Sequence, residues 1–182
     1  MNNNNYFYSL CLPFEFNEEI PDFKNVKHVV YDKSNVPNLV AWLATLGIEI
    51  EAGEVFKKTP EDNFQRGIHV DGRRFDNHAK INFIVSTGQS KMRWWKVKEG
   101  YNWQEEITVI GTPYRWAKRE ECDLVAETEM HVPMLVNAGT FHNVEEVDMT
   151  RYCFSFRLIY SSNKQRVLWP EIFNIFKDYI NE

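Results

Sequence analysis

Cysteine is scarce in this chain, and long hydrophobic runs are lacking altogether. The three cysteines, Cys11, Cys122 and Cys153, are an odd number at spacings that match no zinc site, so we expect neither a disulfide framework nor a structural zinc cluster. No apolar stretch approaches the ~20 residues that span a bilayer, and the first residues lack the basic segment of a secretory signal. The sequence therefore predicts a cytoplasmic protein with reduced thiols and no membrane span.

An excess of positive charge is also lacking, because the formal net charge is -5 at pH 7. Proteins that bind nucleic-acid backbones do so mainly through Lys and Arg. One segment, KMRWWKVKEGYNW at 91–103, does interleave basic residues with tryptophans, a pattern able to stack on a nucleic-acid strand or an anionic substrate. The same pattern fits a strand with one tryptophan in the core and solvated lysines around it. The acidic balance favours this second interpretation and argues against nucleic acid as a partner.

Apolar and aromatic residues are plentiful and occur in many short runs. The 182 residues are 43% hydrophobic and 15% aromatic, enough for the core of one domain spanning 1–182. Many short strands at close spacing predict a mainly β fold, a barrel or double-stranded β-helix (jelly roll) with a core at about 48–160. The runs that predict strands are 6–12, 48–56, 66–71, 79–86, 91–98, 106–111, 123–130, 133–137, 140–145 and 151–160.

Two helices are expected to flank the strands. The segment 35–46 has a proline near its start, apolar residues on one face and Gly47 after its end, which are start and stop signals of a short helix. The tail LWPEIFNIFKDYI predicts a final amphipathic helix, because these residues recur at helical spacing: Trp169, Ile172, Phe173, Phe176, Tyr179 and Ile180. The loops at 57–66, 72–78 and 112–121 are expected to frame a pocket entrance.

The run GIHVD at 67–71 places His69 and Asp71 two residues apart. Residues i and i+2 of a strand point to the same face, so both side chains would project into one space, as a pair of metal ligands requires. With His142, they make two imidazoles and one carboxylate, a set that leaves open positions on an octahedral metal and is typical of non-haem Fe(II) oxygenases. His131 is the rival distal ligand, but no arginine follows it at about ten residues.

The strand RYCFS begins with Arg151, nine residues after His142. An arginine that points into a barrel needs an anion to offset its desolvation, so we expect an acidic co-substrate there. Arg157 lies on the same face and is the reserve candidate for that role. The same-face rule gives one set for each side of this strand: Arg151, Cys153 and Ser155 on the pocket side, and Tyr152, Phe154 and Phe156 on the other.

Together these residues resemble the 2-oxoglutarate and Fe(II)-dependent oxygenases, whose pattern is His-x-Asp, a distal His, and an Arg with a Ser or Thr shortly after. The resemblance covers about 66–160, and RYCFS after FHNVEEVDMT is similar to the prolyl-hydroxylase type of C-terminal motif. It implies that three residues hold Fe(II): His69, Asp71 and His142. It also implies that Arg151, helped by Ser155, binds the distal carboxylate of 2-oxoglutarate. In most members the serine lies two residues after the arginine, where this chain has Cys153.

The family analogy further suggests that Asn82, in AKINFIV, contacts the co-substrate or the substrate, although an Asn that fills a gap in strand hydrogen bonding fits as well. The resemblance implies a dioxygenase that consumes O2 and 2-oxoglutarate, hydroxylates a small molecule or peptide side chain, and releases succinate and carbon dioxide. The alternative is a cupin-like metal-binding jelly roll, a binding protein or isomerase, which has no need of Arg151. A third interpretation, an interaction module without metal, leaves the pairing of His69 and Asp71 unexplained.

Overall fold

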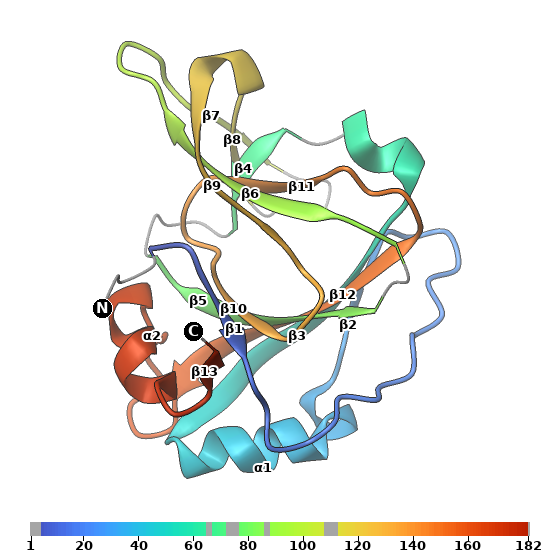
Figure 1. Ribbon diagram of the computed structural model, residues 1–182, viewed down its shortest axis with the longest axis vertical. Coiled ribbons are helices and arrows are strands. Elements are labelled where there is room, and N and C mark those ends of the chain that lie inside the picture. Colours follow the sequence, from blue (N-terminus) through green and yellow to red (C-terminus); the bar gives the residue numbers. More distant parts are fainter. Residues whose placement is uncertain (1–4, 65–66, 72–76, 86–87, 108–112, 182) are drawn as a thin grey trace.

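The computed structural model describes residues 5–64, 67–71, 77–85, 88–107 and 113–181, and the structural findings concern these residues. Within them the fold is mainly β, built from two antiparallel sheets (Figure 1). Sheet A has the strand order β13-β1-β10-β5-β12-β3-β2, and sheet B has the order β7-β8-β4-β11-β6-β9. The prediction of a mainly β protein with a helix near each end is confirmed. In Figure 1, sheet B lies above sheet A, helix α1 lies below sheet A, and helix α2 lies at its left.

The elements have the following bounds. Sheet A contains β1 (Phe7–Leu10), β2 (His28–Val30), β3 (Ile48–Lys58), β5 (Ala79–Val85), β10 (Met134–Asn137), β12 (Arg151–Tyr160) and β13 (Ile180–Asn181). Sheet B contains β4 (Ile68–Val70), β6 (Lys91–Val97), β7 (Gln104–Ile107), β8 (Pro113–Ala117), β9 (Cys122–Glu129) and β11 (His142–Glu145). The α-helices are α1 (Pro37–Thr45) and α2 (Trp169–Phe176), and the short 3-10 helices are Lys33–Asn35, Pro60–Phe64 and Arg119–Glu121.

Most predicted strands are found close to their expected positions, but sheet B contains one that was expected to be a loop. The segment 112–121 includes β8, whose backbone pairs with β4 on one side and β7 on the other. Its proline is at the first residue, where a strand tolerates the missing donor. The strand expected at 106–111 begins earlier, at Gln104, and its part at 108–111 lies outside the described residues. Strand β2 was not predicted at all.

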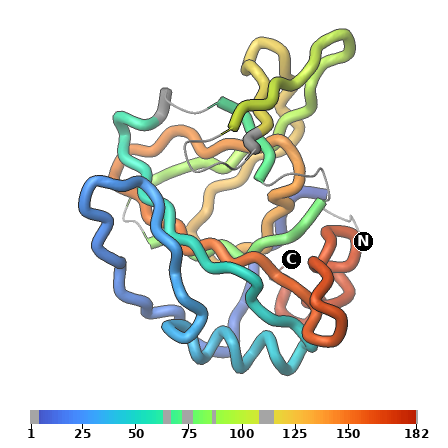
Figure 2. Tube along the Cα trace, turned by 180° about the vertical axis from the view of Figure 1, so that it is seen from behind, coloured from blue at the N-terminus to red at the C-terminus, as the bar shows by residue number. Residues whose placement is uncertain are grey.

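Of the other two expected pocket loops, the one at 57–66 differs from its prediction and the one at 72–78 is mostly not described. Residues 57 and 58 belong to β3, which is paired with β12 along its length, and a 3-10 helix follows at Pro60–Phe64. Of the loop expected at 72–78, residues 72–76 lie outside the described residues, as do 65 and 66 of the loop at 57–66. Figure 2, seen from behind, shows β3 and β12 crossing the molecule side by side.

The larger apolar core lies between sheet A and the two helices. Phe154 and Phe156 of β12 are fully buried there, as the alternation of RYCFSF predicts. Leu39 and Leu43 contribute from α1, and Phe176 contributes from α2. This face of β12 therefore anchors the strand, and its opposite face is free to carry polar side chains.

The prediction of one continuous helix in the tail is wrong beyond Phe176. Helix α2 ends there, and Ile180–Asn181 form β13, which pairs with Ser9 and Leu10 of β1. The backbone N–H of Cys11 also donates to the carbonyl oxygen of Tyr179 at 2.8 Å. An unpaired edge of β1 would leave its backbone donors and acceptors without protein partners, and the tail satisfies them. This non-local pairing outweighs the local helical spacing.

A second apolar cluster joins the two sheets. It consists of Met92, Trp94, Met130, Met134 and Val136, with Trp94 fully buried. The Trp94 indole N–H donates to the carbonyl oxygen of Asn137 at 3.0 Å, so a hydrogen bond as well as apolar packing joins the two sheets here. Within the part of the chain that is described, no helix has the length and apolar character to cross a membrane.

Candidate metal centre

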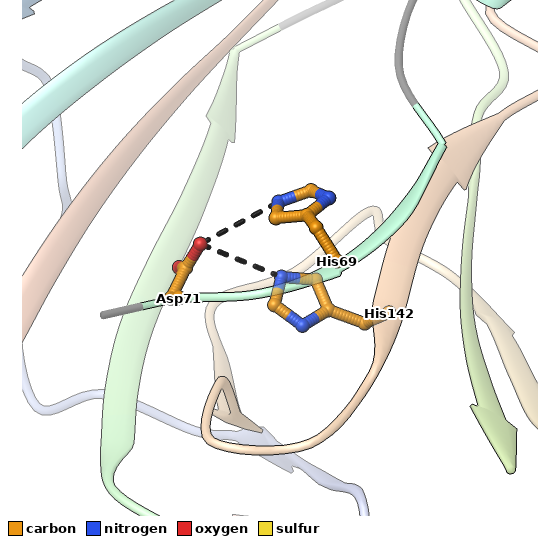
Figure 3. A group of neighbouring side chains, drawn as sticks. All are labelled: His69, Asp71 and His142. Atoms are coloured by element: carbon orange, nitrogen blue, oxygen red, sulfur yellow. Dashed lines mark ion pairs between the residues drawn. The ribbon is translucent and has the colours of Figure 1, made fainter. Parts of the chain in front are cut away.

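The structure brings together the three side chains that the sequence predicts as metal ligands (Figure 3). One oxygen of Asp71, Oδ1, lies 3.5 Å from Nε2 of His69 and 3.9 Å from Nε2 of His142. The ligand atoms of all three residues lie within 4.8 Å of one another. Two imidazoles and one carboxylate thus converge on a single point.

Strand pairing and alternation explain this convergence. His69 lies in β4 directly opposite His142 in β11, so the two rings project from adjacent strands with centroids 4.7 Å apart. Ile68 and Val70, on either side of His69, are buried in an apolar cluster on the other face of the sheet. Asp71 is the first residue after β4, and its backbone N–H donates to the carbonyl oxygen of Ala138 at 3.1 Å.

Backbone carbonyls set the tautomers of both imidazoles. Nδ1 of His69 lies 3.2 Å from the carbonyl oxygen of Gly67, and Nδ1 of His142 lies 2.8 Å from that of Thr140. A carbonyl only accepts, so Nδ1 is the donor in each of these hydrogen bonds, and Nε2 is the nitrogen that faces Asp71. Burial lowers the pKa of His142 to about 4, which keeps this ring neutral at neutral pH. Neutral imidazoles oriented through their second nitrogen are usual metal ligands.

The other oxygen of Asp71 is held by a lysine that the sequence interpretation missed. Nζ of Lys80 lies 2.8 Å from Oδ2 of Asp71. Burial alone would raise the pKa of Asp71, but the ammonium of Lys80 holds it well below its usual range. A signal was available, because Lys80 is two residues before Asn82 in AKINFIV and strand alternation puts both on one face.

The donor set and its spacing fit a divalent transition metal. Donors at right angles around a metal with bonds of about 2.1 Å lie about 3 Å apart, so the observed N–O separations exceed this by roughly 1 Å or less. Small rotations of side chains that border a cavity are enough to close that difference. Iron binding itself stays a prediction.

The ligands border a cavity of about 180 Å³ that lies between the two sheets. Sheet B contributes His69 and His142, and sheet A contributes polar residues of β5 and β12. The pocket side of β12 is the one that alternation predicts, since Arg151, Cys153 and Ser155 all line the cavity. Asn82 also lines it, directly across the β5–β12 pairing from Ser155. The cavity therefore contains all six residues proposed for the site.

Arg151 is a buried cation without a carboxylate partner in the described residues. It is 4% exposed, its Nη2 lies 3.5 Å from the sulfur of Met130, and its Nε lacks a hydrogen-bond partner within the same residues. Burial lowers the pKa of Arg151, yet a guanidinium stays charged in proteins. Oδ1 of buried Asn82 likewise has no hydrogen-bond partner in this part of the structure. Buried polar atoms of this kind are normally satisfied by a protein group, a water, an ion or a ligand, and both of these atoms belong to residues that border the cavity.

The reserve candidates lie elsewhere. His131 has a side chain that is 54% exposed and lies 2.9 Å from Oε2 of Glu129. Arg157 lies 3.4 Å from Oε2 of Glu51 and does not line the cavity. The structure therefore favours His142 and Arg151 over their rivals.

The basic segment 91–103 is largely engaged within the protein. Arg93 is held by three carboxylates, with its Nε 3.0 Å from Oε2 of Glu127 and its other nitrogens on Glu145 and Glu146. Trp94 faces the core, as the strand interpretation expected for one of the two adjacent tryptophans. These contacts support the structural interpretation of the segment.

Comparison with known proteins gives no assignment. A scan against protein-family models found no matching family, and a search of curated proteins found no match. Functional inference for this chain rests on the residues of the site and their geometry.

Proposed function

We propose that the protein is a non-haem Fe(II) and 2-oxoglutarate-dependent dioxygenase. The observation that carries the proposal is the buried guanidinium of Arg151, which borders the same cavity as His69, Asp71 and His142 and has no carboxylate partner in the described residues. A dicarboxylate co-substrate would give Arg151 its missing anion. A metal-binding protein without such a co-substrate has no use for a buried cation at this place.

The residues have separate tasks in this proposal. His69, Asp71 and His142 hold Fe(II), and Arg151 binds the distal carboxylate of 2-oxoglutarate. Ser155 and Asn82, buried and paired across β12 and β5, offer a hydroxyl and an amide to the co-substrate or the substrate. When bound, Fe(II) supplies the oxidation in which substrate R–H, 2-oxoglutarate and O2 give R–OH, succinate and carbon dioxide.

The chain also supplies an enclosure for that reaction. Phe56 of β3, Met92 of β6 and Val144 of β11 give the cavity apolar walls, which keep water from competing for the open metal positions. The volume of about 180 Å³ is below that of usual ligand pockets, so the site favours small ligands.

The jelly-roll architecture is part of the same proposal. Strands β3-β12-β5-β10 are neighbours in sheet A, and β4-β11-β6-β9 are neighbours in sheet B. Two four-stranded antiparallel sheets between which the chain passes back and forth are what a double-stranded β-helix requires. This arrangement supports a site between the sheets.

Anaerobic visible absorption tests the proposal without knowledge of the substrate. Purified apo-protein is titrated with Fe(II) and then with 2-oxoglutarate, beside the His69→Ala variant. We expect a broad metal-to-ligand charge-transfer band in the wild type and none in the variant. His131→Ala, which alters an exposed histidine outside the cavity, is the matched control and should retain the band.

The other outcomes separate the alternatives. Iron binding without a band on addition of 2-oxoglutarate would favour the cupin-like metal protein. Absence of metal binding would favour an interaction module and would overturn the metal centre altogether. Oxygen consumption with succinate release, measured afterwards, would show turnover.

A further inference from the structure

Lys80 is almost completely buried, although lysine is rarely buried unless paired. Its side chain is 4% exposed, and Nζ lies 2.8 Å from Oδ2 of Asp71 and 3.5 Å from Oε2 of Glu54. Burial alone would lower the pKa of Lys80, but the two carboxylates raise it above its ordinary value. A buried ammonium is costly to desolvate. Replacing buried ion pairs by apolar residues often leaves the stability of the fold unchanged or increases it. Stability alone therefore does not account for a lysine here.

The two carboxylate oxygens of Asp71 have different neighbours. Oδ2 accepts from Lys80, whereas Oδ1 is the oxygen that faces Nε2 of His69 and of His142. A free aspartate beside a cation can rotate or bind it through both oxygens. With one oxygen occupied by Lys80, Asp71 can offer only the other to a metal.

We propose that Lys80 is a positioning residue of the metal centre, which fixes Asp71 as a ligand through one oxygen, Oδ1. The inference rests on the metal site of the proposed function and not on its co-substrate. Outer residues that hold ligating carboxylates and imidazoles commonly decide metal affinity in this way. Lys80 does not line the cavity, so it acts through Asp71 rather than on a substrate.

Glu54 offsets the charge that Lys80 brings to the site. A lysine next to a ligand repels a divalent cation, but Glu54 also lies against this ammonium and itself contacts Nε2 of His28 at 3.2 Å. A hydrogen bond from His28 and the charge of Lys80 lower the pKa of Glu54, although burial alone would raise it. The trio Asp71, Lys80 and Glu54 carries one net negative charge, which still favours a cation.

The lysine also connects the two sheets at the site. Lys80 lies in β5 of sheet A, directly opposite Arg157 of β12 and Val136 of β10, whereas Asp71 follows β4 of sheet B. The ammonium thus ties the only carboxylate of the ligand set to a central, well-paired strand of the other sheet. Strand β5, which carries Lys80, is held rigid by pairing with β10 on one side and β12 on the other.

Cobalt(II) binding tests the inference without iron oxidation or turnover. Apo-protein is titrated with Co(II) in the absence of 2-oxoglutarate, following the d–d absorption, for wild type and Lys80→Met. We expect about 10- to 100-fold weaker binding in Lys80→Met and an altered d–d spectrum, because Asp71 is then free to use either or both oxygens. Charge alone predicts the opposite sign, since removing a positive neighbour should tighten the binding of a dication.

Two further variants complete the test. Lys91→Met is the matched control, because Lys91 is also a strand lysine with a carboxylate partner, Glu146 at 3.0 Å, but does not line the cavity. It should bind Co(II) as the wild type does. If Lys80→Met does not fold, the double variant Lys80→Met with Glu54→Gln removes both charges together and carries the same expectation.

The outcomes distinguish this inference from the proposed function. Binding in the folded Lys80 variant that is as tight as in the wild type or tighter, with an unchanged spectrum, overturns the positioning role alone. A wild type that binds Co(II) but shows no spectral response to 2-oxoglutarate overturns the dioxygenase proposal, and the comparison of the lysine variants still decides the role of Lys80. A wild type that binds no Co(II) overturns both.

Discussion

Replacing Arg151 by methionine should change stability and co-substrate affinity in opposite directions. The guanidinium is 4% exposed and borders the cavity without a carboxylate partner in the described residues, and its Nη2 lies 3.5 Å from the sulfur of Met130. A buried charge without a partner destabilises the fold, whereas methionine keeps much of the volume and requires no partner. The ligand-free variant should therefore be more stable than the wild type.

The two magnitudes follow from the burial of Arg151. Replacing buried charged groups by apolar side chains of similar volume stabilises proteins by about 1–4 kcal/mol, and we expect about 1–2 kcal/mol because Arg151 still borders a cavity. For a chain of this size that corresponds to a rise in Tm of about 2–8 °C. Losing one partner of a buried charge pair costs about 3–5 kcal/mol, so the Kd of 2-oxoglutarate should rise on the order of 10²- to 10³-fold.

Urea unfolding followed by tryptophan fluorescence measures the first effect, and the anaerobic Fe(II) titration with 2-oxoglutarate measures the second. The matched control is Arg157→Met on the same strand, because Arg157 has a carboxylate partner in Glu51 at 3.4 Å and lies outside the cavity. It should lose a little stability and keep its affinity for 2-oxoglutarate. A destabilised Arg151 variant with unchanged 2-oxoglutarate affinity would refute the reasoning and make Arg151 a structural residue.

Three further predictions concern other residues of the cavity. His142→Ala should abolish measurable Fe(II) binding in isothermal titration calorimetry, as His69→Ala should, and binding that persists at wild-type affinity in either variant would exclude that imidazole as a ligand. Ser155→Ala should raise the Kd of 2-oxoglutarate by only about 3- to 10-fold, the worth of one hydrogen bond, and no change would remove Ser155 from the co-substrate site. Burial opposes ionisation of Asp62, but hydrogen bonds from Lys27 and Thr59 lower its pKa to about 2. Because that is below the unfolded value of about 3.9, Asp62 stabilises the fold fully above about pH 4 and loses this effect as the pH falls toward 2. Asp62→Asn should flatten that part of the plot of urea stability against pH, and an unchanged plot would contradict the shift.

Local periodicity predicted the parts of the site that lie within one strand. The alternation of GIHVD put His69 and Asp71 on one face, and both line the cavity. The alternation of RYCFSF correctly separated Arg151 and Ser155 from the buried phenylalanines. This succeeds because the period of two is a property of the strand itself. Whether the side chains bind iron and 2-oxoglutarate is not decided by periodicity and stays a prediction.

Pairing between distant strands is where prediction from the sequence failed. The tail strand β13 was missed because its backbone partner, β1, lies at the other end of the chain. Lys80 was missed for a related reason, since its partner Asp71 belongs to the other sheet. Local spacing carries no information on which edge is left unpaired or which charge lies across a sheet-to-sheet interface.

The division of the site between two sheets has a consequence for its energetics. Both imidazoles lie on adjacent strands of sheet B, so their relation to each other is set by hydrogen bonding within that sheet. Arg151 lies in sheet A, and its distance from the ligands is set by packing between the sheets, where Met92 both lines the cavity and belongs to the cluster around Trp94. Close-packed interiors transmit small displacements, whereas a strand pair keeps its register. In the proposed function, the β4–β11 pairing therefore sets how the two imidazoles lie relative to each other, whereas the cross-sheet core sets how far Arg151, the proposed co-substrate anchor, lies from them.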